Sequence, residues 1–227
     1  MIYAISFDLD DTLWDTAPVI QRAEEVTHEW LATHFPRIAE RYSVTGLMAL
    51  RAEVSRQEPE RAFDFTYMRR KTFHVAAVQA GYMPEEVVDA AFELFLQERH
   101  RVAFFDDVLP TLDWLHKQFR LVALTNGNAD ISRIGLQHYF EFALCARDIG
   151  RPKPHPDLFA AACARLNATP EQVVHVGDHL KHDIAGAAAA GLRTIWLNRD
   201  HSPLIIDQQP DAEIHSLSEL QSVLANW

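Results

Sequence analysis

Two acidic side chains and one hydroxyl follow short apolar segments of the chain, at positions where buried strands would end. Asp8 follows residues 2–7, Thr125 follows residues 120–124, and Asp178 follows residues 173–176 and Gly177. Ligands of open α/β sheets bind beyond the carboxyl ends of the strands, so these side chains are expected to lie at one site. Lys153, in a loop before a helical pattern, adds a positive charge. Together they form a chemically coherent catalytic set.

The first of these positions opens an acidic segment, residues 8–12, with the sequence DLDDT. One alternative is a plain acidic turn, and another is a calcium loop that begins Asp-x-Asp. An EF-hand loop needs glycine at its sixth position and glutamate at its twelfth. Counting from Asp8 gives Leu13 and Val19 instead, which excludes that loop.

Alternating apolar and helical patterns predict how these residues are positioned. Apolar runs at 2–7, 120–124, 173–176 and 194–197 predict buried parallel strands. Helical patterns are found at 109–119, 130–139, 155–166 and 184–190, and the Ser-x-x-Glu spacing of Ser216 and Glu219 predicts a last helix at 218–225. This order predicts an α/β fold with a Rossmann-like, doubly wound parallel sheet.

A long segment after the first strand has a different character. Helical patterns at 18–34, 44–56, 65–80 and 84–101 follow one another without a strand between them. We therefore expect an all-helical insertion over residues 15–104, which splits the α/β domain into residues 1–14 and 105–227.

Composition limits the possible partners. The 227 residues include 21 Lys plus Arg and 32 Asp plus Glu, a net charge of −11, which disfavours nucleic acid and anionic membranes. No apolar run approaches the roughly 18 residues of a membrane span. The two cysteines, Cys145 and Cys163, form no CxxC pair, and no basic segment precedes the first apolar run. A cytoplasmic protein is expected, and no oligomeric state is predicted.

Four motifs, in order along the whole chain, together resemble the haloacid dehalogenase superfamily of phosphohydrolases, in the branch with a helical cap inserted after the first motif. They are Asp8-x-Asp10-x-Thr12, Thr125 in LTNGN, Lys153 in RPKP, and Gly177-Asp178 followed by Asp183. The TNGN segment and residues 64–69 are also similar to bacterial flavin-pathway phosphatases, which act on FMN or a phosphorylated ribitylaminouracil.

The resemblance implies a Mg²⁺-dependent phosphatase of small phosphorylated metabolites. A carboxylate such as Asp8, with an ordinary pKa of about 3.9, is ionised at neutral pH and can attack phosphorus to form an aspartyl phosphate. By resemblance, Asp10 is the general acid and base. The implied Mg²⁺ ligands are Asp8, Asp178 and the backbone carbonyl of Asp10, with Asp183 orienting the ligands.

The implied phosphate-binding groups are Thr125, Asn126 and Lys153, aided by the following helix N-terminus. For Thr125 the alternative is a structural threonine that ends a strand. For Lys153 it is a solvated loop lysine, although Pro152 and Pro154 stiffen its placement.

Other functions are weighed against this one. The dehalogenase branch is not expected, because its carbon-centred chemistry does not use a second aspartate in the first motif, and Asp10 is present. A phosphomutase of the same superfamily is one alternative, and a non-catalytic module that binds a metabolite or a partner is another.

Two further groups of residues have competing interpretations. His175, His179 and His182 surround the last motif, but we expect packed or solvated histidines rather than a zinc site, and His175 is expected to turn away from the other two. Arg69 begins a basic run on an expected helix, where a solvated face is the alternative to a contact with the substrate. Arg69 is the residue of this run predicted to select substrates.

Overall fold

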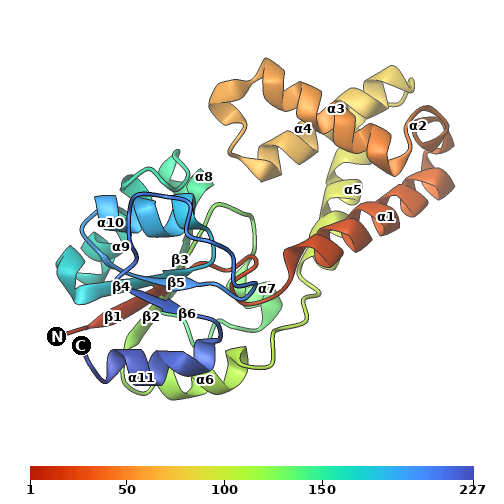
Figure 1. Ribbon diagram of the computed structural model, residues 1–227. Coiled ribbons are helices and arrows are strands. Elements are labelled where there is room, and N and C mark those ends of the chain that lie inside the picture. The colour runs from red at the N-terminus through yellow and green to blue at the C-terminus, as the bar shows by residue number, and fades with distance from the viewer. The chain divides into compact units, whose positions relative to one another are not determined.

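The computed structural model describes residues 1–227, which form two compact units. The first unit consists of Met1–Asp15 and Ala103–Trp227, and the second of Thr16–Val102. Figure 1 shows both units, with the ribbon coloured by residue number. None of the helices combines the length and the apolar character needed to span a membrane.

The first unit is built on a six-stranded parallel sheet with the order β3-β2-β1-β4-β5-β6. The strands are β1 (Ala4–Phe7), β2 (Arg120–Thr125), β3 (Phe142–Cys145), β4 (Val173–Gly177), β5 (Arg193–Leu197) and β6 (Ala212–Ile214). The four predicted strands are confirmed. Sequence patterns missed β3 and β6, which have only four and three residues and therefore too little periodicity to detect.

The register of the sheet brings the expected site residues to one edge. Phe7 at the end of β1 pairs with Ala123 of β2 on one side and with Val176 of β4 on the other. Since the strands are parallel, the residues after these three positions leave the sheet at the same edge. The topology thus gathers the end of β1 with the ends of β2 and β4, each more than a hundred residues further along the chain.

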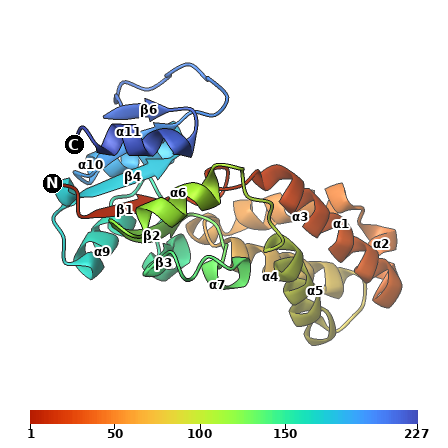
Figure 2. The same ribbon diagram turned by 90° about the horizontal axis from the view of Figure 1, so that it is seen from below.

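Helices cover both faces of this sheet. In Figures 1 and 2, α9 (Asp157–Leu166) and α10 (Gly186–Ala189) lie over one face, and α6 (Val108–Leu115) and α11 (Leu220–Leu224) lie over the other. Leu158, Phe159 and Ala162 of α9 pack with Val122 and Leu124 of β2 in one apolar core. The α/β fold with a doubly wound parallel sheet is confirmed.

Two helix predictions had different outcomes. The last helix is confirmed: Ser216 and Glu219 form the expected capping box at η4 (Leu217–Glu219), which leads into α11. The helix predicted at 130–139 is wrong, because α7 spans only Ile131–Ile134. It ends at Gly135, whose φ of +88° is a left-handed conformation that glycine adopts without strain.

The second unit is entirely helical. It contains α1 (Thr16–His34), α2 (Pro36–Arg41), α3 (Val44–Gln57), η1 (Pro59–Arg61), α4 (Phe65–Gln79) and α5 (Pro84–Arg99). All four predicted helices are confirmed, whereas the six-residue α2 was missed. Its own core includes Leu31 of α1, Phe73 of α4 and Phe92 of α5. Ser43 and Asp64 cap α3 and α4 by accepting from the backbone N–H groups of Gly46 and Tyr67.

Candidate active site

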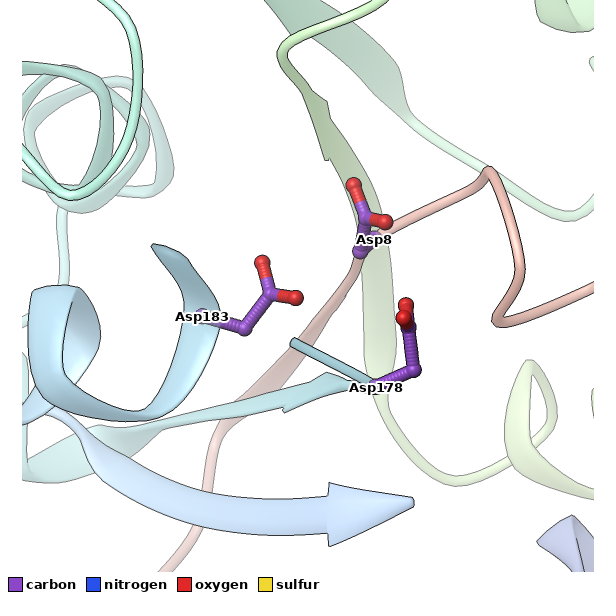
Figure 3. A group of neighbouring side chains, drawn as sticks. All are labelled: Asp8, Asp178 and Asp183. Atoms are coloured by element: carbon purple, nitrogen blue, oxygen red, sulfur yellow. The ribbon is translucent and has the colours of Figure 1, made fainter. Parts of the chain in front are cut away.

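Three carboxylates converge at the carboxyl edge of the sheet, as Figure 3 shows. Asp8 follows β1, Asp178 follows β4, and Asp183 comes from the helical turn after β4. One side-chain oxygen of each lies within 4.8 Å of the others, so the three can hold one metal ion. Sequence reasoning expected Asp8 and Asp178 here but assigned Asp183 only a supporting position.

Lys153 is buried among these carboxylates. Its side chain is 2% exposed, and the ammonium group donates to Oδ1 of Asp8 and Oδ1 of Asp183, both at 2.6 Å, and to the carbonyl oxygen of Leu124 at 2.8 Å. The alternative of a solvated loop lysine is therefore wrong. A buried cation in contact with the first motif is well placed to neutralise an anion bound at this edge.

Asn126 has a different contact from the one predicted. Its side-chain Oδ1 accepts from the backbone N–H of Lys153 at 2.7 Å, and its Nδ2 donates to the Lys153 carbonyl at 3.0 Å. Both ends of the amide are thus hydrogen-bonded to the Lys153 backbone, so this side chain positions the lysine, and phosphate binding by Asn126 stays a prediction. The hydroxyl oxygen of Thr125 accepts from the Gly127 N–H at 2.8 Å and so shapes the turn after β2.

A π-helix places Asp183. Residues Leu180–Ala185 form this wide turn, a rare conformation that is often found at functional sites. Asp183 is 1% exposed, and its Oδ2 accepts from the backbone N–H of His179 at 3.0 Å. Its carboxyl group lies directly against Gly177, where a β-carbon would clash with it. Gly177 is therefore required by this close approach.

Two neutral side chains donate hydrogen bonds to the carboxylates of Asp178 and Asp10. The Thr12 hydroxyl donates to Oδ1 of Asp178 at 2.9 Å, and the Trp14 indole N–H donates to Oδ1 of Asp10 at 3.1 Å. The group of carboxylates close enough to hold one metal ion comprises Asp8, Asp178 and Asp183, without the Asp10 side chain. Thr12 belongs to the first motif, but its hydrogen bond to Asp178, which follows the neighbouring strand β4, was not predicted.

The site contains more acidic than basic groups, and this shifts the pKa values of its carboxyls. Burial raises the pKa of Asp178 to about 7, and the neighbouring Asp183 adds to this rise. Burial also raises the pKa of Asp8, with Asp183 and Asp178 adding to the rise and Lys153 opposing it. Lys153 holds the pKa of Asp183 well below its usual range, against the effect of burial. When all three carboxylates are ionised, the one ammonium leaves two negative charges, which one divalent cation would balance.

His175 contacts the site from within the sheet. The ring is fully buried, with Nδ1 2.9 Å from the Ser6 hydroxyl and Nε2 3.2 Å from Oδ1 of Asp183. Burial lowers the pKa of His175. Because the ionised Asp183 carboxylate can only accept, the Nε2–H of His175 is the donor in their contact. The sequence contained one signal for this contact. His175 and Gly177 are two residues apart in a strand and so lie on the same face, and Asp183 packs against Gly177.

His179 and His182 contact each other. Their rings stack with centroids 3.9 Å apart. Nδ1 of His179 accepts from the backbone N–H groups of Lys181 and His182, which caps the π-helix. His175 does not join them.

A cavity of about 460 Å³ lies beside Asp178 within the first unit. Small-molecule sites commonly have volumes of about 300–1,000 Å³, so the cavity suits a small metabolite. Its lining includes Phe105, Asp178, Trp196, Asn198, Arg199 and Ser202.

Arg69 lies in the helical unit and is 7% exposed, so the solvated-face alternative is wrong for this residue. Its guanidinium donates to Oε1 of Glu24 at 2.7 Å and lies 3.4 Å from the centre of the Phe95 ring. Arg51 binds the same Glu24 oxygen at 2.6 Å. Burial lowers the pKa of Arg69 to about 10, so it stays charged at neutral pH. These contacts support a structural role, and substrate selection by Arg69 stays a prediction.

We expect Arg69→Ala to lower the local unfolding free energy of the helical unit by about 2–3 kcal/mol. Breaking a buried pair costs roughly 3–5 kcal/mol, and here Arg51 remains beside Glu24 to offset part of the loss. Hydrogen exchange of the α1 and α4 amides measures this quantity. The matched control is Arg70→Ala, which removes an exposed pair with Asp89 and should cost no more than about 1 kcal/mol. Equal protection in the two variants would contradict the structural role.

The sequence itself matches a known family over most of its length. The model of the haloacid dehalogenase-like hydrolases matches residues 2–191, which include all four motifs and both segments of the first unit's site. The chain belongs to the haloacid dehalogenase-like hydrolase family. The predicted resemblance is confirmed, and so is the prediction of a hydrolytic enzyme.

Relatives of this haloacid dehalogenase-like hydrolase carry two kinds of name. It is 35% identical to 5-amino-6-(5-phospho-D-ribitylamino)uracil phosphatase YigB of Escherichia coli, over 98% of this chain and 96% of the relative. It is 31% identical to a phosphoserine phosphatase of Thermus thermophilus, over 92% and 80%. A crystal structure of a 2-haloacid dehalogenase from Pseudomonas syringae pv. Tomato superposes with a TM-score of 0.94, at 45% identity over the full length of both chains.

Proposed function

We propose that this hydrolase is a Mg²⁺-dependent phosphatase of small phosphorylated metabolites that works through an aspartyl phosphate on Asp8. The observation that carries the proposal is the buried Lys153 ammonium, 2.6 Å from Oδ1 of Asp8, beside a cluster of three carboxylates. A nucleophilic carboxylate and a phosphate ester repel one another, so a site for phosphoryl transfer must supply positive charge.

In the first step, an Asp8 oxygen attacks phosphorus and the bond between phosphorus and the leaving oxygen breaks. Asp10 donates its proton to that oxygen, so the product alcohol leaves uncharged. Lys153 offsets the negative charge that collects on the transferring group.

In the second step, Asp10 takes a proton from a water molecule that attacks the phosphorus of the aspartyl phosphate. The bond between phosphorus and the Asp8 oxygen breaks, inorganic phosphate leaves, and the Asp8 carboxylate is restored. Asp183, bonded to Lys153, His175 and the His179 N–H, keeps the ammonium in place through both steps.

The donor set fits Mg²⁺. Carboxylate oxygens are the hard ligands that this ion prefers, and the two uncompensated negative charges of the cluster equal its charge. Asp8 and Asp178, with the Asp10 backbone carbonyl, would hold it, and Asp183 would orient the group. When bound, the ion would stabilise negative charge on the phosphoryl oxygens.

For the substrate we propose a small phosphate ester with a polyol leaving group, such as a phosphorylated ribityl compound of the flavin pathway. The relation to the Escherichia coli ribitylaminouracil phosphatase supports this class. The cavity of about 460 Å³ beside Asp178 is consistent with a small ligand. In this proposal the helical unit, Thr16–Val102, is the cap that selects among leaving groups.

A second candidate is hydrolysis of 2-haloacids, which is favoured by the 45% identity to the Pseudomonas syringae dehalogenase structure. A carboxylate nucleophile would then attack carbon and expel halide. Two observations favour phosphoryl transfer instead. The Trp14 indole donates a hydrogen bond to Asp10, and the three carboxylates suit a divalent cation.

The deciding experiment measures two products from the purified full chain. Phosphate release is measured with Mg²⁺ on a panel that includes ribitylaminouracil phosphate, FMN, phosphoserine and sugar phosphates. Halide release is measured on 2-chloropropionate with and without chelator. We expect phosphate release that chelator abolishes, fastest on the ribityl phosphates. Halide release with no phosphate release would overturn the proposal.

We expect Asp178→Asn to raise the Mg²⁺ concentration needed for half-maximal activity at least about 100-fold, since loss of a mere outer contact costs about 10–100-fold in metal affinity. Asparagine keeps the shape and the Thr12 contact but loses the charge. In the parent, a proton must leave Asp178 before the ion binds, so the requirement should fall as the pH rises through about 7. The variant should lose that dependence. An exposed carboxylate, Asp106, provides the matched control as Asp106→Asn.

A further inference from the structure

Trp14 is a large side chain buried next to the proposed acid and base. It is 0% exposed, and its indole N–H donates to Oδ1 of Asp10 at 3.1 Å. The two residues also form a backbone bridge, and the Trp14 carbonyl accepts from the Asp11 N–H at 3.0 Å. The Trp14 ring packs edge-on against Phe104 with centroids 6.1 Å apart. The indole is thus held by its backbone and by its ring.

Burial alone does not explain this choice of side chain. A phenylalanine would fill much of the same space, whereas a buried indole N–H must find an acceptor. The acceptor here is Asp10. Lys153 donates to both Asp8 and Asp183, Thr12 donates to Asp178, and Trp14 donates to Asp10, so each of these four carboxylates accepts from a side-chain donor.

The chemistry of the donor suits a group that gains and loses a proton. An indole N–H is neutral and donates only. It can bond Oδ1 of Asp10 whether the carboxyl is protonated or ionised, and it reserves that oxygen as an acceptor. The proton that Asp10 exchanges would then sit on Oδ2.

We propose that Trp14 is the positioning residue for proton transfer by Asp10, and this inference rests on the proposed phosphatase function. Its indole N–H holds the carboxyl in one orientation while the leaving group is protonated. Loss of the N–H should therefore slow formation of the aspartyl phosphate, the step that kcat/KM reports, only where the leaving oxygen needs a proton.

Two esters separate this role from a structural one. Nitrophenolate is an acidic leaving group that departs without a proton, whereas an alkoxide needs one. We expect Trp14→Phe to lower kcat/KM for an alkyl phosphate such as glycerol 2-phosphate by roughly 10–100-fold, given that general acid catalysis contributes about 10²–10⁴-fold. For para-nitrophenyl phosphate the loss should be under about 3-fold.

The matched control is Trp114→Phe. Trp114 is a half-buried tryptophan of the first unit, on α6, and its ring packs edge-on against Phe119. This change should leave the ratio of the two esters' kcat/KM values unaltered. Replacement of Trp14 by benzothienylalanine, which has the shape of tryptophan without the N–H, repeats the test if Trp14→Phe does not fold.

Each result has a defined meaning. Equal losses on both esters in the Trp14 variants, no loss on either, or the same discrimination in Trp114→Phe would overturn the inference while the phosphatase function stands. If the parent enzyme releases no phosphate from either ester, the proposed function fails, and the inference fails with it.

Discussion

Asp8→Asn is expected to lower kcat for phosphate esters by roughly 10⁴-fold or more, the scale seen when a nucleophile is removed from a covalent mechanism. The amide has nearly the shape of the carboxylate but cannot form the aspartyl phosphate. Lys153 keeps its bonds to Asp183 and to the Leu124 carbonyl, so the fold should be preserved. Phosphate release at saturating substrate measures the effect, and near-UV circular dichroism checks the fold.

The chain offers a matched control three residues later. Asp11 is an exposed carboxylate of the same segment with a φ of +62°, a conformation that asparagine tolerates well. Asp11→Asn should change kcat by less than about 3-fold, within the usual range of a surface substitution. A folded Asp8→Asn protein that retained a tenth or more of the parent's kcat would rule out the covalent mechanism.

Lys153→Met is expected to lower kcat about 10³-fold and to destabilise the first unit by about 3–5 kcal/mol at neutral pH. Methionine fills the volume of the lysine but leaves Asp8 and Asp183, both buried, without their cation. Urea unfolding in the presence of chelator measures the stability. An exposed lysine of the same unit provides the control as Lys181→Met, which should change the free energy of unfolding by less than about 0.5 kcal/mol.

The contribution of Asp183 to stability should depend on pH in opposite senses in this variant and in the parent. In the parent, Lys153 holds the pKa of Asp183 below its unfolded value, so this contribution to stability is present above the unfolded pKa and is lost as the pH falls. Without the lysine, burial and mutual repulsion raise the pKa of both carboxyls above their unfolded values, and stability is lost as the pH rises. Lowering the pH from about 7 to about 5 should therefore restore part of the variant's loss. An unchanged difference between variant and parent would contradict this account.

Residue order was sufficient to predict the strands that end at Asp8, Thr125 and Asp178, the helical character of residues 15–104, and a catalytic edge. Each of these rests on local patterns: apolar runs for buried strands, helical periodicity, and charged residues directly after a strand. The ordered motifs then identified the family, because their spacing reflects one topology. Short elements such as β3, β6 and α2 escaped detection, since a few residues carry little periodic signal.

The contacts that make these residues a site depended on the tertiary structure. Lys153 contacts Asp8, which lies 145 residues away in the sequence, and Thr12 contacts Asp178, which lies 166 residues away. Asn126 binds the Lys153 backbone, His175 donates to Asp183, and Arg69 is buried against Glu24. None of these pairings has a local pattern, because each is set by the strand order, by the π-helix after β4 or by packing between helices. A side chain's residue type indicates which partners suit it, and only the folded chain decides which partner lies within reach.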